Sequence, residues 1–401
     1  MSIGARIRFA WFSLVFVEGR ANALPLPETP AASPRGSQAA VPSPQEPGEG
    51  AAVPAAKEPW EKPIGVTAGV RVGARLRSAA GREFSSLSED GELDLSFSGD
   101  ISPFIGLQAA VIAQFGPTLT GASIAGDAAM RDVIAKIKIH EALNVWLGRM
   151  IVPSDRSAFS GPYSMGPWNY PGFFEPFAPP VGPRQGPFGR NDGVTVWGSI
   201  VGGVLKYYLG AFNLHDSSLA PLYTTRLNLS VLDPEPAYYQ KATYLGEKDI
   251  LALGLAGQFQ WAGSVEALPA AAPGMPSAVP RKAAFAELNA DLLFERNLGT
   301  AGTLTLESAF AKYFGDFERF DYSHFVLWSY LTPSKLGVGK LQPLFRVQQA
   351  KPRNAGTFLL IDAQLGYIIE KHAARVAFGY QRSALTNVVG NVLFFGVQIL
   401  K

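Results

Sequence analysis

The sequence predicts an all-β protein: a closed antiparallel transmembrane β-barrel of about 16 strands, with an inward loop rich in proline and aromatic residues. Three observations predict this fold. From Ile64 onward apolar and polar residues alternate with a period of two, and helical periodicity is nowhere sustained. Most alternating segments are about 9 to 14 residues long, close to the ~9–11 residues with which a strand crosses a bilayer. Long and short connections alternate between them, as in outer-membrane barrels.

Composition excludes several other classes of protein. Charged residues make up 17% of the 401 residues, and the net charge is +2, so no surface for nucleic acid is indicated. Cysteine is absent, which excludes disulfides and thiolate metal sites. No run of residues approaches the ~20 apolar residues of a spanning helix.

Residues 1–23 have the features of a secretory signal peptide. Arg6 and Arg8 form a basic start, residues 9–17 are apolar, and the small residues Ala21 and Ala23 form a cleavage site. The alternative is a buried first strand. We expect the segment to direct the chain out of the cytoplasm.

Residues 24–63 differ sharply in composition from the rest of the chain. They contain ten prolines and eight alanines, a composition typical of an extended linker without a core of its own. We therefore expect a Pro/Ala-rich periplasmic linker over 24–63 and the transmembrane β-barrel over 64–401.

The first barrel segment illustrates how each strand is predicted. Val66, Val70 and Val72 alternate with polar positions that include Arg71 and Arg75, which gives one apolar and one basic face. The same criterion predicts strands at 65–77, 92–100, 103–115, 132–140, 142–150, 192–200, 203–213, 224–232, 249–262, 282–295, 302–315, 322–332, 340–350, 357–370, 372–383 and 391–400.

The sheet is expected to close into a barrel because its apolar face would lie in lipid. Lipid cannot satisfy backbone hydrogen bonds, so a sheet that spans a membrane must close on itself. Sixteen strands enclose an aqueous lumen, and the polar faces would line it. The alternative is a secreted soluble all-β binding protein, which would need its polar faces outside.

One connection cannot be an ordinary surface loop. Residues 160–183, in the third outer connection (151–191), hold seven prolines, six aromatic residues and a single charge. Proline excludes a helix interior or a central strand, and a backbone without ladder partners is tolerated at membrane depth only where it lines a cavity. We expect the loop to fold inward as a constriction, with candidate residues Arg156, Tyr163, Trp168, Tyr170, Glu175, Arg184 and Arg190.

The connection 233–248 does not obey the alternation of long and short connections. It is long, although it falls on the side where the others are short. We expect it to form a small periplasmic cap.

The residues around the inward loop resemble those of the phosphate-selective porin O and P family. "VWLGRMIVPSDRS" (145–157) is similar to the family's strand that ends in Gly-Arg before an apolar-Pro turn. "GRNDGVTVWG" (189–198) and "VLKYYLGAFN" (204–213) are similar to its next hairpin. The resemblance covers about 70 residues and implies a trimeric 16-stranded channel that passes phosphate-like anions along lumen lysines and arginines.

The alternation assigns charged residues to the lumen, where they would act on permeating solutes. Five acidic candidates are Asp94, Glu287, Asp291, Glu307 and Asp362. The nine basic candidates for the channel lining are Arg71, Arg75, Arg77, Lys136, Lys138, Lys206, Arg226, Arg346 and Arg375. A positive wall lowers the entry barrier for anions. The expected function is passive diffusion of small hydrophilic solutes through an anion-leaning outer-membrane porin, which needs no cofactor and has lipid and small solutes as partners.

Catalysis is the alternative from a different class. The four histidines, at 140, 215, 324 and 372, lack metal-ligand spacing. "HDSS" (215–218) places a base beside hydroxyl groups without a third partner, so a barrel phospholipase stays open as an alternative. No catalytic residue and no metal ligand is predicted.

Overall fold

The structure is a computed structural model that describes residues 64–79, 84, 86–115, 127–170, 189–213, 220–264, 282–315, 320–353, 356–385 and 388–401. The signal peptide and the linker predicted over 1–63 lie outside these residues. The strands are β1 (Gly65–Ala79), β2 (Ser86–Asp100), β3 (Ile105–Phe115), β4 (Asp127–His140), β5 (Leu143–Ile151), β6 (Arg190–Ile200), β7 (Leu205–Phe212), β8 (Leu222–Ser230), β9 (Ile250–Ser264), β10 (Lys282–Asn297), β11 (Thr303–Gly315), β12 (Phe320–Leu331), β13 (Lys340–Pro352), β14 (Phe358–Glu370), β15 (Ala374–Leu385) and β16 (Val388–Leu400).

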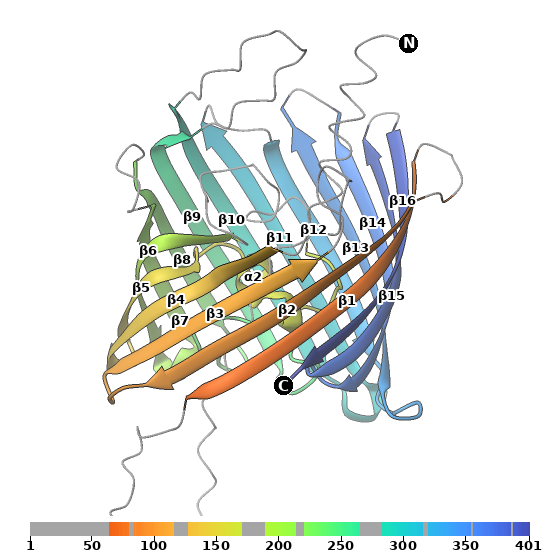
Figure 1. Cartoon of the computed structure of the whole chain (residues 1–401), viewed down its shortest axis with the longest axis horizontal. Helices are drawn as coiled ribbons and strands as arrows, with labels where there is room; N and C mark the ends of the chain where they lie inside the picture. Colours follow the sequence, from red (N-terminus) through yellow and green to blue (C-terminus); the bar gives the residue numbers. More distant parts are fainter. Residues whose placement is uncertain are drawn as a thin grey trace, which may run out of the picture.

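These strands form one closed antiparallel barrel, as the alternation predicts (Figure 1). Each strand pairs with its neighbours in sequence, and β1 closes the sheet against β16 from Gly69↔Leu400 to Ala79↔Gly390. The last residue continues the closure, because the Lys401 backbone nitrogen donates to the Ala68 carbonyl at 2.8 Å. The barrel therefore has no open edge, and its backbone polar groups are satisfied within the sheet.

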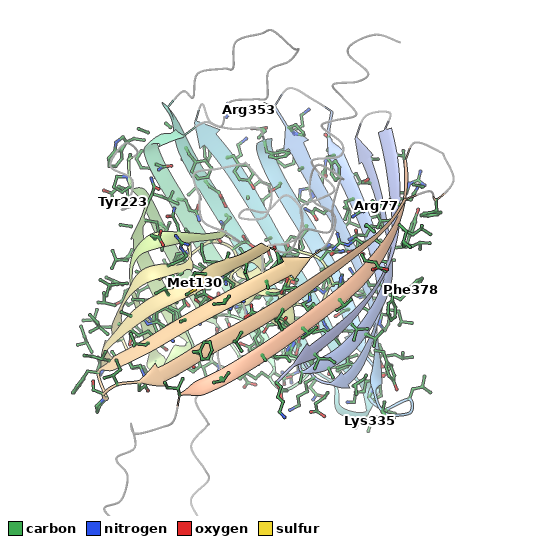
Figure 2. The ribbon with its side chains drawn as sticks, viewed as in Figure 1. Arg77, Met130, Tyr223, Lys335, Arg353 and Phe378 are labelled. Carbon is green, nitrogen blue, oxygen red and sulfur yellow. The ribbon has the colours of Figure 1, made fainter. Side chains whose placement is uncertain are left out.

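The two faces of the barrel differ as a membrane requires. On β1, Val70 and Val72 are exposed on the outside, whereas Arg71 and Arg75 are buried on the inside. Figure 2 shows side chains projecting outward all round the barrel, with Phe378 at mid-height and the charged Lys335 and Arg353 near opposite ends. An apolar belt with charges at its rims is the outer surface expected of a membrane-spanning barrel.

The predicted strand positions agree with the structure, but several ends do not. β2 begins at Ser86 and β4 at Asp127, several residues before the predicted starts at 92 and 132. The added part of β2 pairs with β1, for example Arg75↔Ser88 and Leu76↔Leu87. Strand length there is set by the hydrogen-bond ladder, which continues where the apolar alternation has stopped.

The few helical turns are short. The turn α2 (Arg156–Ser160) and the 3₁₀ turn η1 (Pro162–Ser164) lie between β5 and β6, while η3 (Val201–Gly203) and η4 (Gly299–Ala301) join neighbouring strands. Within the described residues, none of these helices has the length and apolarity needed to cross a membrane.

The first half of the proline-rich connection folds into the barrel, as predicted. We call residues 152–170 the inward loop. All of them are buried except Gly166, which is intermediate. Figure 1 shows α2 inside the barrel, behind β1 to β4. The rest of the connection, 171–188, lies outside the described residues.

The connection between β8 and β9 is not the small cap that the sequence analysis expected. Residues 231–249, which we call the β8–β9 insert, enter the lumen from the other end. Glu235, Tyr238 and Tyr244 are at most 4% exposed there. The insert carries three tyrosines in its sixteen central residues, so its composition already resembles that of the inward loop. Apolar rings need a dry partner surface, and the lumen provides it.

Candidate functional site

A single helical turn in the inward loop places two side chains at the centre of the lumen. Asp155 caps α2 by accepting a hydrogen bond from the Ala158 backbone nitrogen at 3.1 Å. The turn stops at Gly161, whose φ of 74° favours glycine. Between these ends, Arg156 and Phe159 are both fully buried. Burial also raises the pKa of Asp155 from 3.8 to about 6.

Arg156 joins the inward loop to the β8–β9 insert. Its two terminal nitrogens donate to the two carboxylate oxygens of Glu235 at 2.8 and 2.7 Å, and neither side chain is more than 1% exposed. Burial by itself would raise the pKa of Glu235, but the Arg156 guanidinium outweighs burial and holds that pKa well below its usual range. The two inward segments are therefore linked by a buried, bidentate ion pair.

Arg226 adds a second link between the same segments and the wall. From β8 it donates to both oxygens of Asp291 on β10, at 2.5 and 3.0 Å. It also donates to the Ser154 carbonyl in the inward loop at 2.8 Å and to the Gln240 side chain in the insert at 2.8 Å. One side chain thus holds two strands, the loop and the insert in a fixed arrangement.

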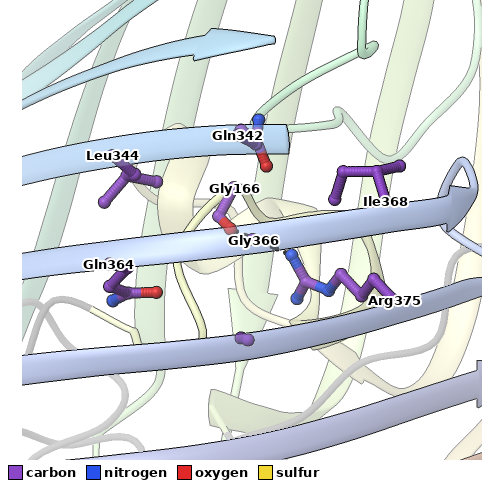
Figure 3. Close-up of a pocket in the computed structure, with 8 residues that line it drawn as sticks. Gly166, Gln342, Leu344, Gln364, Gly366, Ile368 and Arg375 are labelled. Carbon is purple, nitrogen blue, oxygen red and sulfur yellow. Dashed lines mark hydrogen bonds between the residues drawn. The ribbon is translucent and has the colours of Figure 1, made fainter. Parts of the chain in front are cut away.

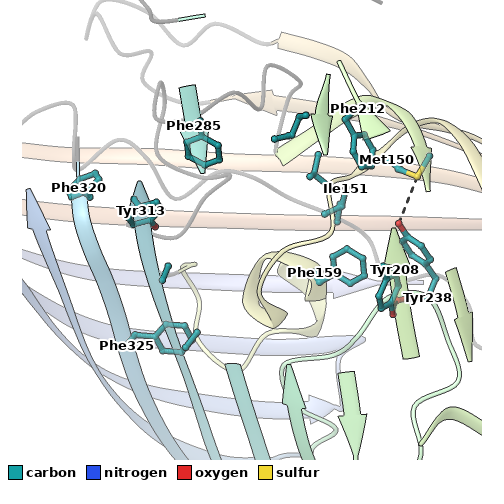
Figure 4. Packing of buried hydrophobic residues seen from close by; sticks show 14 of the residues in the cluster. Met150, Ile151, Phe159, Tyr208, Phe212, Tyr238, Phe285, Tyr313, Phe320 and Phe325 are labelled. Carbon is teal, nitrogen blue, oxygen red and sulfur yellow. Dashed lines mark hydrogen bonds between the residues drawn. The ribbon is translucent and has the colours of Figure 1, made fainter. Parts of the chain in front are cut away.

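An aromatic cluster fills the lumen beside these pairs (Figure 4). Tyr238 of the insert stacks on Trp146 of β5, with ring centroids 4.0 Å apart. Phe159 and Tyr208 each lie 5.3 Å from the Tyr238 ring, and the Tyr208 hydroxyl donates to the Tyr238 carbonyl. None of the four rings is more than 4% exposed. Water is therefore excluded from this sector of the barrel.

The end of the inward loop packs against the lumen face of β1 and β16, where two glycines make room for its aromatic rings. A methyl group at Gly69 of β1 would lie 2.5 Å from the Tyr163 ring, and one at Gly396 of β16 would lie 2.3 Å from the Trp168 ring. Only glycine leaves room for these contacts. The lumen faces of β1 and β16 are thus shaped to receive the aromatic residues of the loop.

Four of the nine predicted lining residues hold this end of the loop. They come from β1, β13 and β15, and the loop brings them together. The nitrogen donors and oxygen acceptors are Arg71 to the Trp168 carbonyl (2.6 Å), Arg75 to the Asn169 side chain (2.9 Å), Arg346 to the Asn169 carbonyl (2.8 Å) and Arg375 to the Met165 carbonyl (2.6 Å). The guanidinium carbons of Arg71 and Arg375 also lie 4.2 and 5.9 Å from the Trp168 ring.

The other five lining candidates are not part of that group. They are Arg226, described above; Lys206, which donates to the Ala237 carbonyl of the insert at 2.7 Å; Lys136, 4.6 Å from the Trp146 ring; Lys138, 2.5 Å from Asp100 at the rim; and Arg77, which donates to Ser88. The basic face predicted from the alternation is therefore divided among several local contacts.

The residues predicted to form the constriction also lie in different parts of the structure. Arg156, Tyr163, Trp168 and Tyr170 are buried within the inward loop. Arg190 is the first residue of β6 and lies 2.9 Å from Asp132 of β4. Glu175 and Arg184 lie outside the described residues.

Buried carboxylates are more numerous than the sequence analysis predicted. Among the described residues, nine lysines and arginines and ten carboxylates are less than 9% exposed. The acids that were missed are Glu92, Asp132, Asp155, Glu235 and Glu295, and the missed arginine is Arg131, which pairs with Asp94 and Asp132. Glu92, Asp132 and Glu295 lie on the polar faces of β2, β4 and β10, so the alternation could have revealed these three acids. Asp155 and Glu235 lie in connections, where no such pattern exists.

The histidine and carboxylate side chains of the described lumen were compared with the requirements of a metal site. No group of three or more histidine or carboxylate side chains there could hold a metal ion. His372 is buried with its Nε2 3.1 Å from the Thr243 carbonyl, and burial lowers its pKa to about 3, so it is neutral at ordinary pH. Residues 215–218, which the sequence analysis considered as a base beside hydroxyl groups, lie outside the described residues.

Comparison with known proteins supports the fold. The chain matches no protein-family model and no curated protein sequence. Among solved structures, it resembles the high-pH structure of OprB from Pseudomonas putida, with a TM-score of 0.60 and 11% identity over 84% of this chain and 94% of that one.

Two further structures resemble it over similar lengths. One is OmpT from the outer membrane of Vibrio cholerae, with a TM-score of 0.53, 12% identity, and 84% and 97% of the two chains covered. The other is the anion-selective porin from Comamonas acidovorans, with a TM-score of 0.51, 12% identity, and 84% and 99% covered. At such identities the likeness shows the fold, which is that of outer-membrane β-barrels.

Proposed function

We propose that this protein is an outer-membrane porin through which small hydrophilic solutes diffuse passively, with a preference for anions. The barrel has an apolar outer belt and a polar, charged lumen, which suits a channel rather than a soluble binding protein. Two segments narrow the lumen, so the channel passes only small solutes. The proposal also includes the predicted signal peptide, the periplasmic linker and assembly as a homotrimer.

The observation that carries the anion preference is the pair Arg71 and Arg375. Both guanidinium groups lie beside Trp168 and, within the described residues, bond only to carbonyl and side-chain amide oxygens rather than to a carboxylate. In contrast, Arg156 and Arg226 are neutralised by Glu235 and Asp291. Glu92 of β2 lies opposite Arg71 in the strand register, so Arg375 supports the proposal more strongly than Arg71. A guanidinium in a narrow lumen that bonds to neutral oxygens keeps a positive field, which attracts anions and repels cations.

Charges of both signs border the lumen around the barrel. Arg71, Arg75, Arg346 and Arg375 lie on β1, β13 and β15, and the acids Glu92, Asp94 and Asp362 lie on the neighbouring β2 and β14. Arg346 is paired with Asp362 at 2.8 Å. The preference for anions is therefore proposed from the arginines that bond to neutral oxygens and not from a count of the lumen charges.

Solute release from liposomes tests the channel against the enzyme alternative. We expect purified protein to release a trapped small anion from liposomes, which protein-free liposomes retain. No lysophospholipid should form, and His215→Ala should leave the rate of release unchanged. Lipid hydrolysis that disappears in His215→Ala would favour a phospholipase instead.

A further inference from the structure

We infer that the outer face of β11 to β13, near the end of the barrel where the inward loop begins, binds a phosphate-bearing lipid headgroup of the surrounding leaflet through Lys312, Lys351 and Arg353. The inference goes beyond diffusion through the lumen, because it concerns the outer wall. It depends only on the barrel fold and on its place in the outer membrane.

Strand direction shows which leaflet surrounds these residues. β5, β11 and β13 run in the same direction in the antiparallel barrel, so the last residues of all three lie at one end. The long connections lie at this end, including the inward loop after β5 and the connection between β9 and β10. Long connections mark the extracellular end of an outer-membrane barrel, so the lipid beside these residues belongs to the outer leaflet.

Alternation shows which residues of β13 face that lipid. Gln342 and Leu344 point into the lumen beside Gly166 of the inward loop (Figure 3), where the space holds little more than a water molecule. The residues that alternate with them point outward, as the 42% exposure of Phe345 shows. Lys351 belongs to this outward set and lies near the end of the strand.

The strand register places two lysines and a tyrosine side by side on the outer face. Lys312 of β11 lies opposite Tyr322 of β12, and Tyr322 lies opposite Lys351 of β13. Neighbouring strands are about 4.8 Å apart, so only two such spacings separate the backbones of the two lysines. Arg353 directly follows β13 and is exposed. Three cations therefore gather over three adjacent strands.

Asp321 is the acid beside these cations. Its carboxylate pairs with Lys312, and the charges of Lys351 and Arg353 also act on it. The side chains of Lys312 and Asp321 are 36% and 44% exposed, so the group is accessible from outside. An ammonium has three N–H donors, so a lysine that bonds to one carboxylate can still donate to a second acceptor.

The residues nearer the middle of the barrel show the depth of the group. The Tyr322 ring lies 6.2 Å from the rings of both Phe310 and His324, which gives an aromatic level next to the cations. Farther along β12, Val326 and Trp328 are 47% and 48% exposed on the same face. Aromatic residues mark the interface of a membrane barrel, and the apolar band follows. The cations therefore lie level with the lipid headgroups.

A phosphate headgroup fits this arrangement. Lysine and arginine donate charge-assisted hydrogen bonds to phosphate oxygens, and clustered cations beside a membrane attract anionic headgroups. The exposed rings beneath the cations offer contact to the acyl chains of the same lipid. A zwitterionic headgroup brings its own cation, so it should be held less tightly.

Lipid A, a phosphorylated lipid, is the probe, and native mass spectrometry of the full chain in detergent micelles counts the bound molecules. Wild-type protein should hold lipid A more tightly than it holds phosphatidylcholine. The triple variant Lys312→Gln/Lys351→Gln/Arg353→Gln should bind lipid A roughly tenfold or more less tightly, since each cation at the membrane surface contributes to the attraction.

Two further variants complete the test. Lys335→Gln/Lys340→Gln/Lys401→Gln removes the same number of cations from the other end of the barrel, where Figure 2 shows Lys335, and should bind lipid A as the wild type does. Asp321→Asn removes only the acid and should tighten binding. If the triple variant loses the heat-modifiable mobility of a folded barrel, Asp321→Asn decides, because unchanged or weaker binding would overturn the inference.

The remaining outcomes are equally decisive. Unchanged binding in a folded triple variant would overturn the inference, and so would an equal loss in the control variant. Displacement of lipid A by inorganic phosphate at the same concentration would also overturn it, because the surface would then recognise a free anion instead of a lipid. These measurements do not depend on conductance, so their failure leaves the porin proposal untouched.

Discussion

Arg156 and Glu235 form the contact on which the arrangement of the lumen depends most strongly. The pair is fully buried and joins two segments that enter from opposite ends. Because a buried charge without its partner is strongly unfavourable, we expect Glu235→Gln to reduce the free energy of unfolding by about 3–5 kcal/mol. Denaturation in detergent micelles would measure this loss.

The double variant provides the control for that prediction. When Arg156→Gln and Glu235→Gln are combined, neither member of the pair is left as a buried charge without the other, so the loss should be clearly smaller than the sum of the two single losses. Additive losses would show that the pair does not act as a unit.

The pKa of Glu235 is lower in the folded protein than in the unfolded chain. Its carboxylate therefore stabilises the fold at pH values above the pKa that Glu235 has in the unfolded chain. This stabilisation is lost only as the pH falls below that range, so it should persist from pH 5 to 8.

Asp155 should have the opposite effect on the pH dependence of stability. Its pKa is raised from 3.8 to about 6 because the carboxyl group is buried. The folded state therefore favours the protonated acid, and the stabilisation present below pH 4 is lost as the pH rises through 6. Asp155→Asn keeps an oxygen that can cap α2 and removes the ionisation.

We expect Asp155→Asn to raise the melting temperature at pH 7.5 and to have little effect at pH 4. A scan of thermal stability at both values would check this. An equal change at both values would show that the ionisation of Asp155 does not contribute.

At the scale of elements, the strands were predictable and the inward segments only partly so. Lipid imposes alternation on every strand, and that pattern is visible locally in the sequence, as in Val70, Arg71 and Val72. The depth of the β8–β9 insert depends on partners such as Trp146 and Arg156, which are distant in sequence. The missed acids Asp155 and Glu235 show the same limit, because they lie in connections, where no alternation indicates that a side chain faces the lumen.

The packing of the inward loop against β1 and β16 gives a prediction at the scale of elements. Gly396→Ala places a methyl group 2.3 Å from the Trp168 ring, so the ring and the end of the loop must shift away from the wall. The strand ladder needs no side chain at this position, so the barrel should still form. We expect a changed single-channel conductance with the heat-modifiable mobility of the folded barrel preserved.

Gly65→Ala is the control for this substitution, because its methyl group would lie no closer than 3.5 Å to any atom beyond its two neighbours in the chain. It should conduct as the wild type does. If Gly396→Ala also conducts as the wild type does, the contact between Trp168 and the wall does not shape the pore.

At the scale of the whole molecule, the inward loop and the β8–β9 insert both fill part of the lumen, and buried charges of both signs border it. This arrangement could not be predicted from the net charge of +2 or from the number of lumen charges, which are nearly balanced among the buried residues. Selectivity therefore depends on which charges are paired with an opposite charge and which are not.

The reversal potential in a potassium chloride gradient across a planar bilayer tests the central claim most directly. Wild-type protein should form channels whose reversal potential shows chloride preference. The Arg71→Gln/Arg375→Gln double variant should shift it toward potassium, whereas Lys335→Gln/Arg353→Gln, which removes two charges at the barrel ends (Figure 2), should not. Absence of channels, or a wild-type reversal potential that shows potassium preference, would contradict an anion-preferring porin.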